Sequence, residues 1–130
     1  TDIIMLAGGI GIVPLLSMIQ FAVLKQLPNA ITLFYCNHDA RDIAYYDELQ
    51  LLKAQHAEFT AHFLVSTPPR APKKDVLQER ISWEFMRERV TPNEDTLFYI
   101  CGSECFMEHT LGFLLKNGVS KKCIKKEVFT

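Results

Sequence analysis

The segment Gly8-Gly9-Ile10-Gly11 has the composition of an anion-binding turn. It follows an aliphatic run and precedes Pro14, which suits the first turn of a helix because its missing N–H is not needed there. Glycines let backbone N–H groups approach an anion closely, and the helix directs its positive end toward that anion. A pyrophosphate group is the ligand that this turn favours. Pro14 replaces the third glycine of the fingerprint G-x-G-x-x-G, so a tight turn without a ligand explains the glycines equally well.

A second turn whose residues could take part in chemistry is Cys101-Gly102-Ser103, which follows another apolar run. A cysteine at the end of a buried strand is commonly a small packing residue. The functional alternative places its soft, compact side chain beside a planar cofactor ring. The start of the next helix is the one nearby feature that would lower a thiol pKa, so nucleophilic catalysis is disfavoured.

The cysteines and histidines predict no metal site. Cys101 and Cys105 straddle a strand end and a helix start, so their thiols need not converge, and no spacing of the histidines closes a tetrahedral site. An iron–sulfur cluster needs four converging thiolates, but the cysteines are scattered along the chain. The residues concerned are Cys36, Cys101, Cys105, Cys123, His38, His56, His62 and His109.

Composition indicates one globular domain in a chain of 130 residues. Hydrophobic residues make up 48% and charged residues 22%, which is enough apolar material to cover both faces of a sheet. Fourteen Lys and Arg against fifteen Asp and Glu leave no basic surplus for nucleic acid. Four cysteines do not make a disulfide scaffold, so we expect a reduced, cytoplasmic setting.

The chain from Ile3 to Leu24 carries no charged residue and is long enough to span a bilayer. Its glycines and Pro14 would interrupt a spanning helix near its start, and no basic segment precedes it as a signal peptide requires. A buried strand, a glycine turn and a buried helix therefore explain the segment better, and no membrane span is expected.

Apolar runs and helical segments alternate along the whole chain, which predicts a doubly wound, Rossmann-like α/β fold with a five-stranded parallel sheet. Strands are expected at residues 2–7, 31–36, 59–65, 96–101 and 123–129, and helices at about 14–27, 45–55, 82–89 and up to 116. A proline- and lysine-rich loop is expected at residues 66–74. Ligands bind outside the carboxyl ends of such strands, which directs attention to the turns after Ala7, Cys36 and Cys101.

Four motifs in order resemble the nicotinamide-nucleotide half of the ferredoxin–NADP reductase superfamily, and the Cys-Gly-Ser…Phe-Met version is similar to the reductase modules of flavohemoglobins and oxygenases. The motifs lie at residues 7–14, 34–49, 99–107 and 124–129. The resemblance covers almost the whole chain and implies that residues 1–130 are an NAD(P)-binding domain. A flavin-binding barrel is expected upstream, because the chain begins on the first strand and contains no Arg-x-Tyr-Ser motif.

The resemblance also implies a role for individual residues, with Cys101 as the expected catalytic residue beside the nicotinamide. The cofactor-binding residues it implies are, at the pyrophosphate, Gly8, Gly9, Ile10, Gly11 and Pro14; facing the adenosine ribose, Asn37, His38 and Asp39; beside the nicotinamide, Cys101, Gly102 and Ser103; near the adenine side of the groove, Phe106 and Met107; and bordering flavin and nicotinamide, Glu127 and Phe129.

The loop after the second strand is a further departure from the family, and the first helix adds an observation about a partner domain. Arg41 is the one cation beside the loop after the second strand, and Asp39 and Asp42 flank it, which favours NADH over NADPH. The first helix is apolar nearly all round, which a missing partner domain or a central position in the fold would explain. Its apolar residues are Leu15, Leu16, Met18, Ile19, Phe21 and Leu24.

The sequence therefore predicts an NAD(P)H-binding module of a flavin-dependent oxidoreductase, inactive as an isolated domain. It would present the nucleotide for hydride transfer to FAD in a partner domain, in cis or in trans, and onward to an electron acceptor. The alternative is an electron-transfer or regulatory subunit that binds a nucleotide and docks to a separate flavoprotein. A flavin-free dehydrogenase is disfavoured, because His38 is the one acid–base residue that could work with Cys101.

Overall fold

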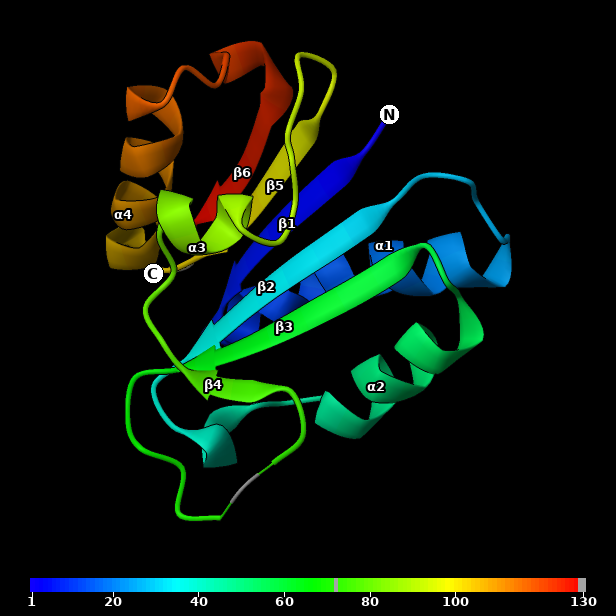
Figure 1. Ribbon diagram of the computed structural model, residues 1–130, viewed down its shortest axis with the longest axis vertical. Helices are drawn as coiled ribbons and strands as arrows, with labels where there is room; N and C mark the ends of the chain where they lie inside the picture. The colour runs from blue at the N-terminus through cyan, green and yellow to red at the C-terminus, as the bar shows by residue number, and fades with distance from the viewer. Residues whose placement is uncertain (72, 129–130) are drawn as a thin grey trace.

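The computed structural model describes residues 1–71 and 73–128, and these form an α/β fold around a parallel sheet (Figure 1). The described part of the chain contributes six strands in the order β4-β3-β2-β1-β5-β6, and every neighbouring pair is parallel. The predicted parallel α/β architecture is confirmed, but the predicted number of five strands is wrong. The additional strand, β4, has three residues between charged neighbours, too few to show a strand periodicity.

The elements alternate along the chain as strand and helix. The strands are β1 (Ile3–Gly8), β2 (Ile31–Asn37), β3 (Phe59–Val65), β4 (Val76–Gln78), β5 (Leu97–Gly102) and β6 (Ile124–Val128). The helices are α1 (Ile12–Leu24), α2 (Tyr46–Gln55), α3 (Trp83–Arg87) and α4 (Glu104–Lys116). Three short 3-10 turns are also present in the described residues: η1 (Gly9–Gly11), η2 (Ala40–Asp42) and η3 (Lys121–Cys123).

The helices form two layers, one on each face of the sheet (Figure 1). Side chains of α1 and α2 pack with one set of strand residues, and those of α3 and α4 pack with the other set. Met5 and Leu6, neighbours on β1, belong to opposite clusters because successive side chains of a strand point to opposite faces. Both faces of the central strands are buried, as their continuous apolar runs require.

Helix α1 begins two residues before Pro14, so this proline lies in the first helical turn, where it costs no hydrogen bond. Leu15 and Ile19 are buried against the sheet, whereas Phe21 and Leu24 are 57% and 78% exposed. Part of the apolar surface of α1 is therefore open in this chain. Among the described helices, none has the length and apolar character needed to cross a membrane.

The contact between Gly11 and Cys101 fixes how the turn after β1 sits on the end of β5. A Cβ built on Gly11 would collide with the Cys101 carbonyl oxygen and carbon and would lie 2.9 Å from the Gly102 nitrogen. All three obstructing atoms are backbone atoms held in a sheet, so they cannot move aside as a flexible side chain could. The turn and the strand end therefore behave as one rigid unit.

We expect Gly11→Ala to lower the free energy of unfolding by about 1–3 kcal/mol, because the methyl group overpacks this backbone contact. Gly112→Ala in α4 is the matched control, since its Cβ would meet nothing within 4 Å. Alanine there should raise stability by about 0.5–1 kcal/mol through its helix propensity. Urea unfolding of both variants measures the difference, and equal stabilities would contradict the packing role of Gly11.

Candidate functional site

A groove of about 1410 Å³ runs along the carboxyl ends of the strands, and we call it the carboxyl-edge groove. It is lined by the turn after β1, the loop between β2 and α2, the ends of β3 and β4, and the first turns of α4. The strand order reverses between β1 and β5, because the chain proceeds outward from β1 to β4 and then returns to the other side of β1. Such a switch point is where open α/β sheets bind ligands.

The three glycines of the first turn have different roles. Gly9 has a φ of 56°, and a Cβ there would meet nothing within 4 Å, so its backbone borders open space. Gly8 packs under the ring of Phe106, whose Cγ would lie 2.7 Å from an added Cβ. Gly11 packs on Cys101 as described above. Gly9 is therefore the position at which a ligand can approach the backbone at the start of α1, and Ile10 beside it is 71% exposed.

Asn37 brings an unsatisfied donor to the groove. It ends β2, lines the groove, and its amide Nδ2 is buried without a hydrogen-bond partner in the described structure. Burial raises the pKa of the neighbouring Tyr35, whose hydroxyl accepts a hydrogen bond from the Ala44 N–H at 3.1 Å. A buried amide without a partner carries a desolvation cost that a ligand acceptor would remove. The Gly9 turn and Asn37 together fit a nucleotide.

The two aspartates of the loop after β2, Asp39 and Asp42, have different surroundings. The Asp39 carboxylate accepts hydrogen bonds from the Arg41 N–H at 2.9 Å and the Arg41 guanidinium at 3.2 Å, which hold its pKa at about 2. The Thr67 hydroxyl donates to its other oxygen at 3.2 Å. Asp42 and His38 line the groove, whereas Asp39 is committed to the loop itself. A direct contact of Asp39 with a ribose therefore remains a prediction.

Cys101 and Glu127 stand side by side on β5 and β6, because they are register partners. Cys101 packs in the cluster on the α1 side of the sheet and is 5% exposed, whereas Glu127 is exposed. Burial and the Glu127 carboxylate raise the pKa of the Cys101 thiol to about 11, so it is protonated at neutral pH. Gly102 pairs with Val128, and the predicted site residue Phe129 lies outside the described residues.

The predicted residues at the start of α4 divide between the groove and the core. Ser103 caps the helix by accepting a hydrogen bond from the Phe106 N–H at 3.3 Å, and both residues line the groove. The Phe106 ring rests on Gly8 and Gly102, where an added Cβ would lie 2.7 Å from a ring carbon in each case. Met107 is buried in the cluster beneath α3 and α4, so the structure gives its side chain a packing role.

Several residues of the groove were not predicted from the sequence, namely Tyr45, Ser66, Glu79, Arg80, Cys105 and His109. Ser66 directly follows β3, so the carboxyl-end rule could have identified it. Arg80 and Glu79 follow β4, which was not predicted as a strand. Tyr45 has a φ of 62°, an uncommon conformation for a non-glycine residue, and is 47% exposed at the groove.

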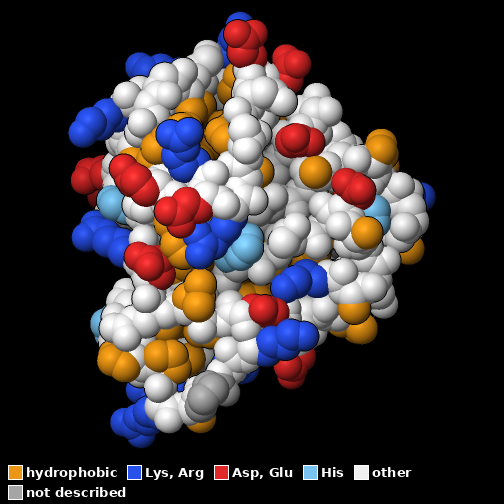
Figure 2. Space-filling model, viewed as in Figure 1, with side chains coloured by type: hydrophobic (Ala, Val, Ile, Leu, Met, Phe, Trp, Pro, Cys, Tyr) orange, Lys and Arg blue, Asp and Glu red, His pale blue; other side chains and the backbone are white. Residues whose placement is uncertain are grey.

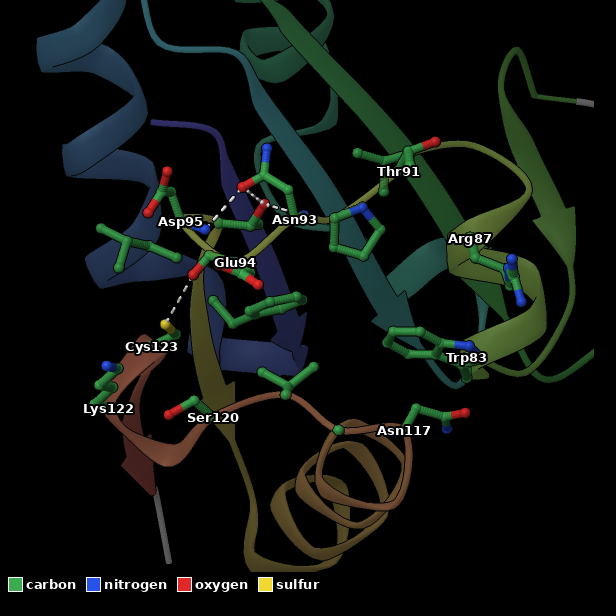
Figure 3. Close-up of a pocket in the computed structure, with 17 residues that line it drawn as sticks. Trp83, Arg87, Thr91, Asn93, Glu94, Asp95, Asn117, Ser120, Lys122 and Cys123 are labelled. Atoms are coloured by element: carbon green, nitrogen blue, oxygen red, sulfur yellow. Dashed lines mark hydrogen bonds between the residues drawn. The ribbon is translucent and has the colours of Figure 1, made fainter.

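A second hollow, of about 960 Å³, lies at the other end of the strands, near the amino end of β5 (Figure 3). It is bordered by the amino end of β5, the loop before it and the end of α4. The Cys123 thiol lies 3.6 Å from the Glu94 carbonyl oxygen, and Asn93 accepts from the Asp95 N–H at 2.8 Å (Figure 3). The Asn93 bond closes a local turn, and the Cys123 contact joins the turn before β6 to the loop before β5. In the described part of the chain, no three His, Cys, Asp or Glu residues gather as a metal site would require.

Comparison with proteins of known sequence finds cytochrome b5 reductases and related reductases. The chain is 38% identical over 103 residues to NADH-cytochrome b5 reductase 3 of Mus musculus, covering 75% of this chain and 33% of that protein. It is 34% identical over 110 residues to an NADH-cytochrome b5 reductase-like protein of Arabidopsis thaliana, covering 83% of this chain. The chain spans about a third of the length of these relatives.

Solved structures and a family model agree with this similarity. The flavohem-like FAD/NAD-binding domain of nitric oxide dioxygenase from Vibrio cholerae superposes with a TM-score of 0.84 at 26% identity, covering 98% of this chain and 50% of that one. The family model described as oxidoreductase NAD-binding domain matches residues 5–111. The chain thus belongs to the oxidoreductase NAD-binding domain family, within the ferredoxin–NADP reductase superfamily.

Proposed function

We propose that this chain binds NADH with its adenosine and diphosphate in the carboxyl-edge groove, the diphosphate at Gly9. The nicotinamide then extends past the groove to Cys101 and Glu127, which do not line it. The observation that carries the proposal is the packing of Gly11 on Cys101, which places the open turn next to the end of β5. One extended ligand can therefore span both sites. When bound, NADH supplies a hydride and its electron pair, which we propose pass to FAD in a flavin-binding domain.

The residues of this chain bind and orient the dinucleotide. Backbone N–H groups at Gly9 and the start of α1 face the diphosphate, since a helix N-terminus favours negative charge. The buried Asn37 amide donates to the adenosine ribose. The protonated Cys101 thiol offers a neutral, compact surface to the nicotinamide ring. Gly102 beside it accommodates the Phe106 ring.

The charges near the adenosine end favour NADH over NADPH. The guanidinium of Arg41 pairs with Asp39 at 3.2 Å, and the ammonium of Lys73 lies 4.3 Å from the centre of the Tyr46 ring. Asp42 lines the groove and would face an added phosphate with a like charge. The 2′-phosphate of NADPH needs a free cation, and in the described loop after β2 the one arginine is already paired.

A flavin-binding domain, in cis or in trans, is the proposed partner. Cys101 faces the α1 side of the sheet, and β5 and β6 continue beyond the area that α1 and α2 cover (Figure 1). Val13 and Phe21 of α1 are more than half exposed. A hollow of about 360 Å³, lined mostly by apolar residues of α1, β1 and β2, lies at the amino ends of these strands. A domain docked along α1 and over the ends of β5 and β6 would bury this apolar surface and enclose the nicotinamide.

A downstream electron acceptor completes the proposed reaction, because a flavin reduced by NADH must pass its electrons on.

We propose that the protein works in the cytoplasm. All four cysteines are free thiols, which supports a reducing environment.

Replacing Gly9 tests the proposed function. We expect Gly9→Asn to weaken NADH binding more than tenfold, because the new side chain fills the open space next to the diphosphate. Asparagine tolerates a positive φ, so the fold should persist. Gly118→Asn is the matched control: Gly118 also has a positive φ and open space, but lies at the second hollow, at the other end of the strands. Fluorescence titration with NADH measures both variants, and unchanged affinity of Gly9→Asn would refute the proposal.

Cys101→Ala should slow flavin reduction by about tenfold to a hundredfold in the protein that contains both domains. Hydride transfer depends steeply on the placement of the reacting atoms, and losing the sulfur lets the ring shift. NADH affinity should change by no more than a small-cavity cost, about 1–2 kcal/mol. Stopped-flow reduction beside an NADH titration separates the two effects. Cys123→Ala is the control, and an unaltered reduction rate in folded Cys101→Ala would make Cys101 a packing residue.

A further inference from the structure

Arg80 is the cation of the carboxyl-edge groove. Among the described residues that line the groove, it is the one lysine or arginine, whereas Asp42 and Glu79 are acidic. The diphosphate of a dinucleotide brings two further negative charges to this place. Helix N-termini offset part of this charge, but a guanidinium has the fork geometry and the full charge that phosphate oxygens favour. The proposed function therefore gives Arg80 a specific task.

His109 holds Arg80 in place from α4. The His109 Nε2 lies 2.7 Å from the Ile81 carbonyl oxygen, and its Nδ1 lies 3.4 Å from the Arg80 Nη2. A carbonyl oxygen can only accept, so Nε2 carries the proton, and Nδ1 then accepts from the guanidinium. The ring also packs edge-on against Phe113, with centroids 5.5 Å apart. The imidazole is thus fixed on the helix and orients a side chain that comes from the loop after β4.

The position of His109 on α4 brings Arg80 to the level of the glycine turn. His109 follows Phe106 by three residues, so the two side chains are neighbours on one face of the helix, with Cβ atoms about 5–6 Å apart. The Phe106 ring covers Gly8, next to the open backbone of Gly9. The guanidinium therefore lies beside the face of α4 whose Phe106 ring covers Gly8, in the same groove as the Gly9 turn.

We propose that Arg80 binds the diphosphate of the dinucleotide and that His109 positions it. This inference rests on the proposed function. The guanidinium donates hydrogen bonds to phosphate oxygens from the β4 side of the groove, opposite the backbone N–H groups of Gly9. A purely structural Arg80 would instead tether the β4–α3 loop to α4, and its loss would affect stability without affecting phosphate binding.

Arg80→Gln separates these roles, because glutamine keeps hydrogen-bonding capacity and removes the charge. In calorimetric titrations we expect NADH and ADP-ribose to bind about tenfold more weakly to this variant at low salt, and the difference should shrink at 1 M salt. Adenosine, which has no phosphate, should bind equally to both proteins. Arg87→Gln on α3, at the second hollow, is the matched control and should leave all affinities unchanged.

His109→Ala tests the positioning role, since it removes the support but keeps the guanidinium. We expect a loss of about threefold in ADP-ribose affinity, and no loss beyond that of Arg80→Gln in the double variant. ADP-ribose affinity that is unchanged in Arg80→Gln would overturn the proposal, as would a loss confined to NADPH, which would place Arg80 at a 2′-phosphate. Wild-type protein without affinity for NADH would instead overturn the proposed function itself.

Discussion

The backbone contact between Gly11 and Cys101 determines how the rest of the groove is arranged. It joins the turn after β1 to the end of β5 across the point where the strand order reverses. Because both partners are main chain, the distance between the turn after β1 and the end of β5, the proposed diphosphate and nicotinamide sites, is set by the sheet and not by mobile side chains. Only glycine permits this approach, so the position has no conservative replacement.

The distribution of charge in the groove matches the ligand proposed for it. Near the proposed adenosine end, Arg41 is paired with Asp39, and hydrogen bonds from the Arg41 backbone N–H and guanidinium lower the pKa of that carboxyl group to about 2. Near the glycine turn, Arg80 is held by a neutral imidazole and keeps its full charge available. On the face that carries α3 and α4, basic and acidic side chains are interspersed (Figure 2), so binding depends on individual contacts and not on a broad field.

The long buried strands could be predicted from the sequence because each is a continuous apolar run that ends at a turn residue. Residues 59–65 were predicted as a strand and match β3. Strand β4 could not be predicted, since three residues give no period, and Arg80 was missed with it. The glycine turn was recognisable, but the separate roles of Gly8 and Gly11 depend on Phe106 and Cys101, about 90 residues away, which local patterns do not contain.

The open surface beside Cys101 has a physical explanation in the chemistry proposed for it. Hydride transfer requires that water be excluded around the nicotinamide, yet Glu127 is exposed and β6 is an edge strand with exposed lysines. On α1, Val13 is exposed near the Gly11–Cys101 contact, and Phe21 is exposed farther along the helix, toward the amino ends of β1 and β2. Exposed apolar surface of this kind is costly in water unless another domain covers it. A flavin-binding domain that docked there would exclude the water and bury the apolar surface through one interface.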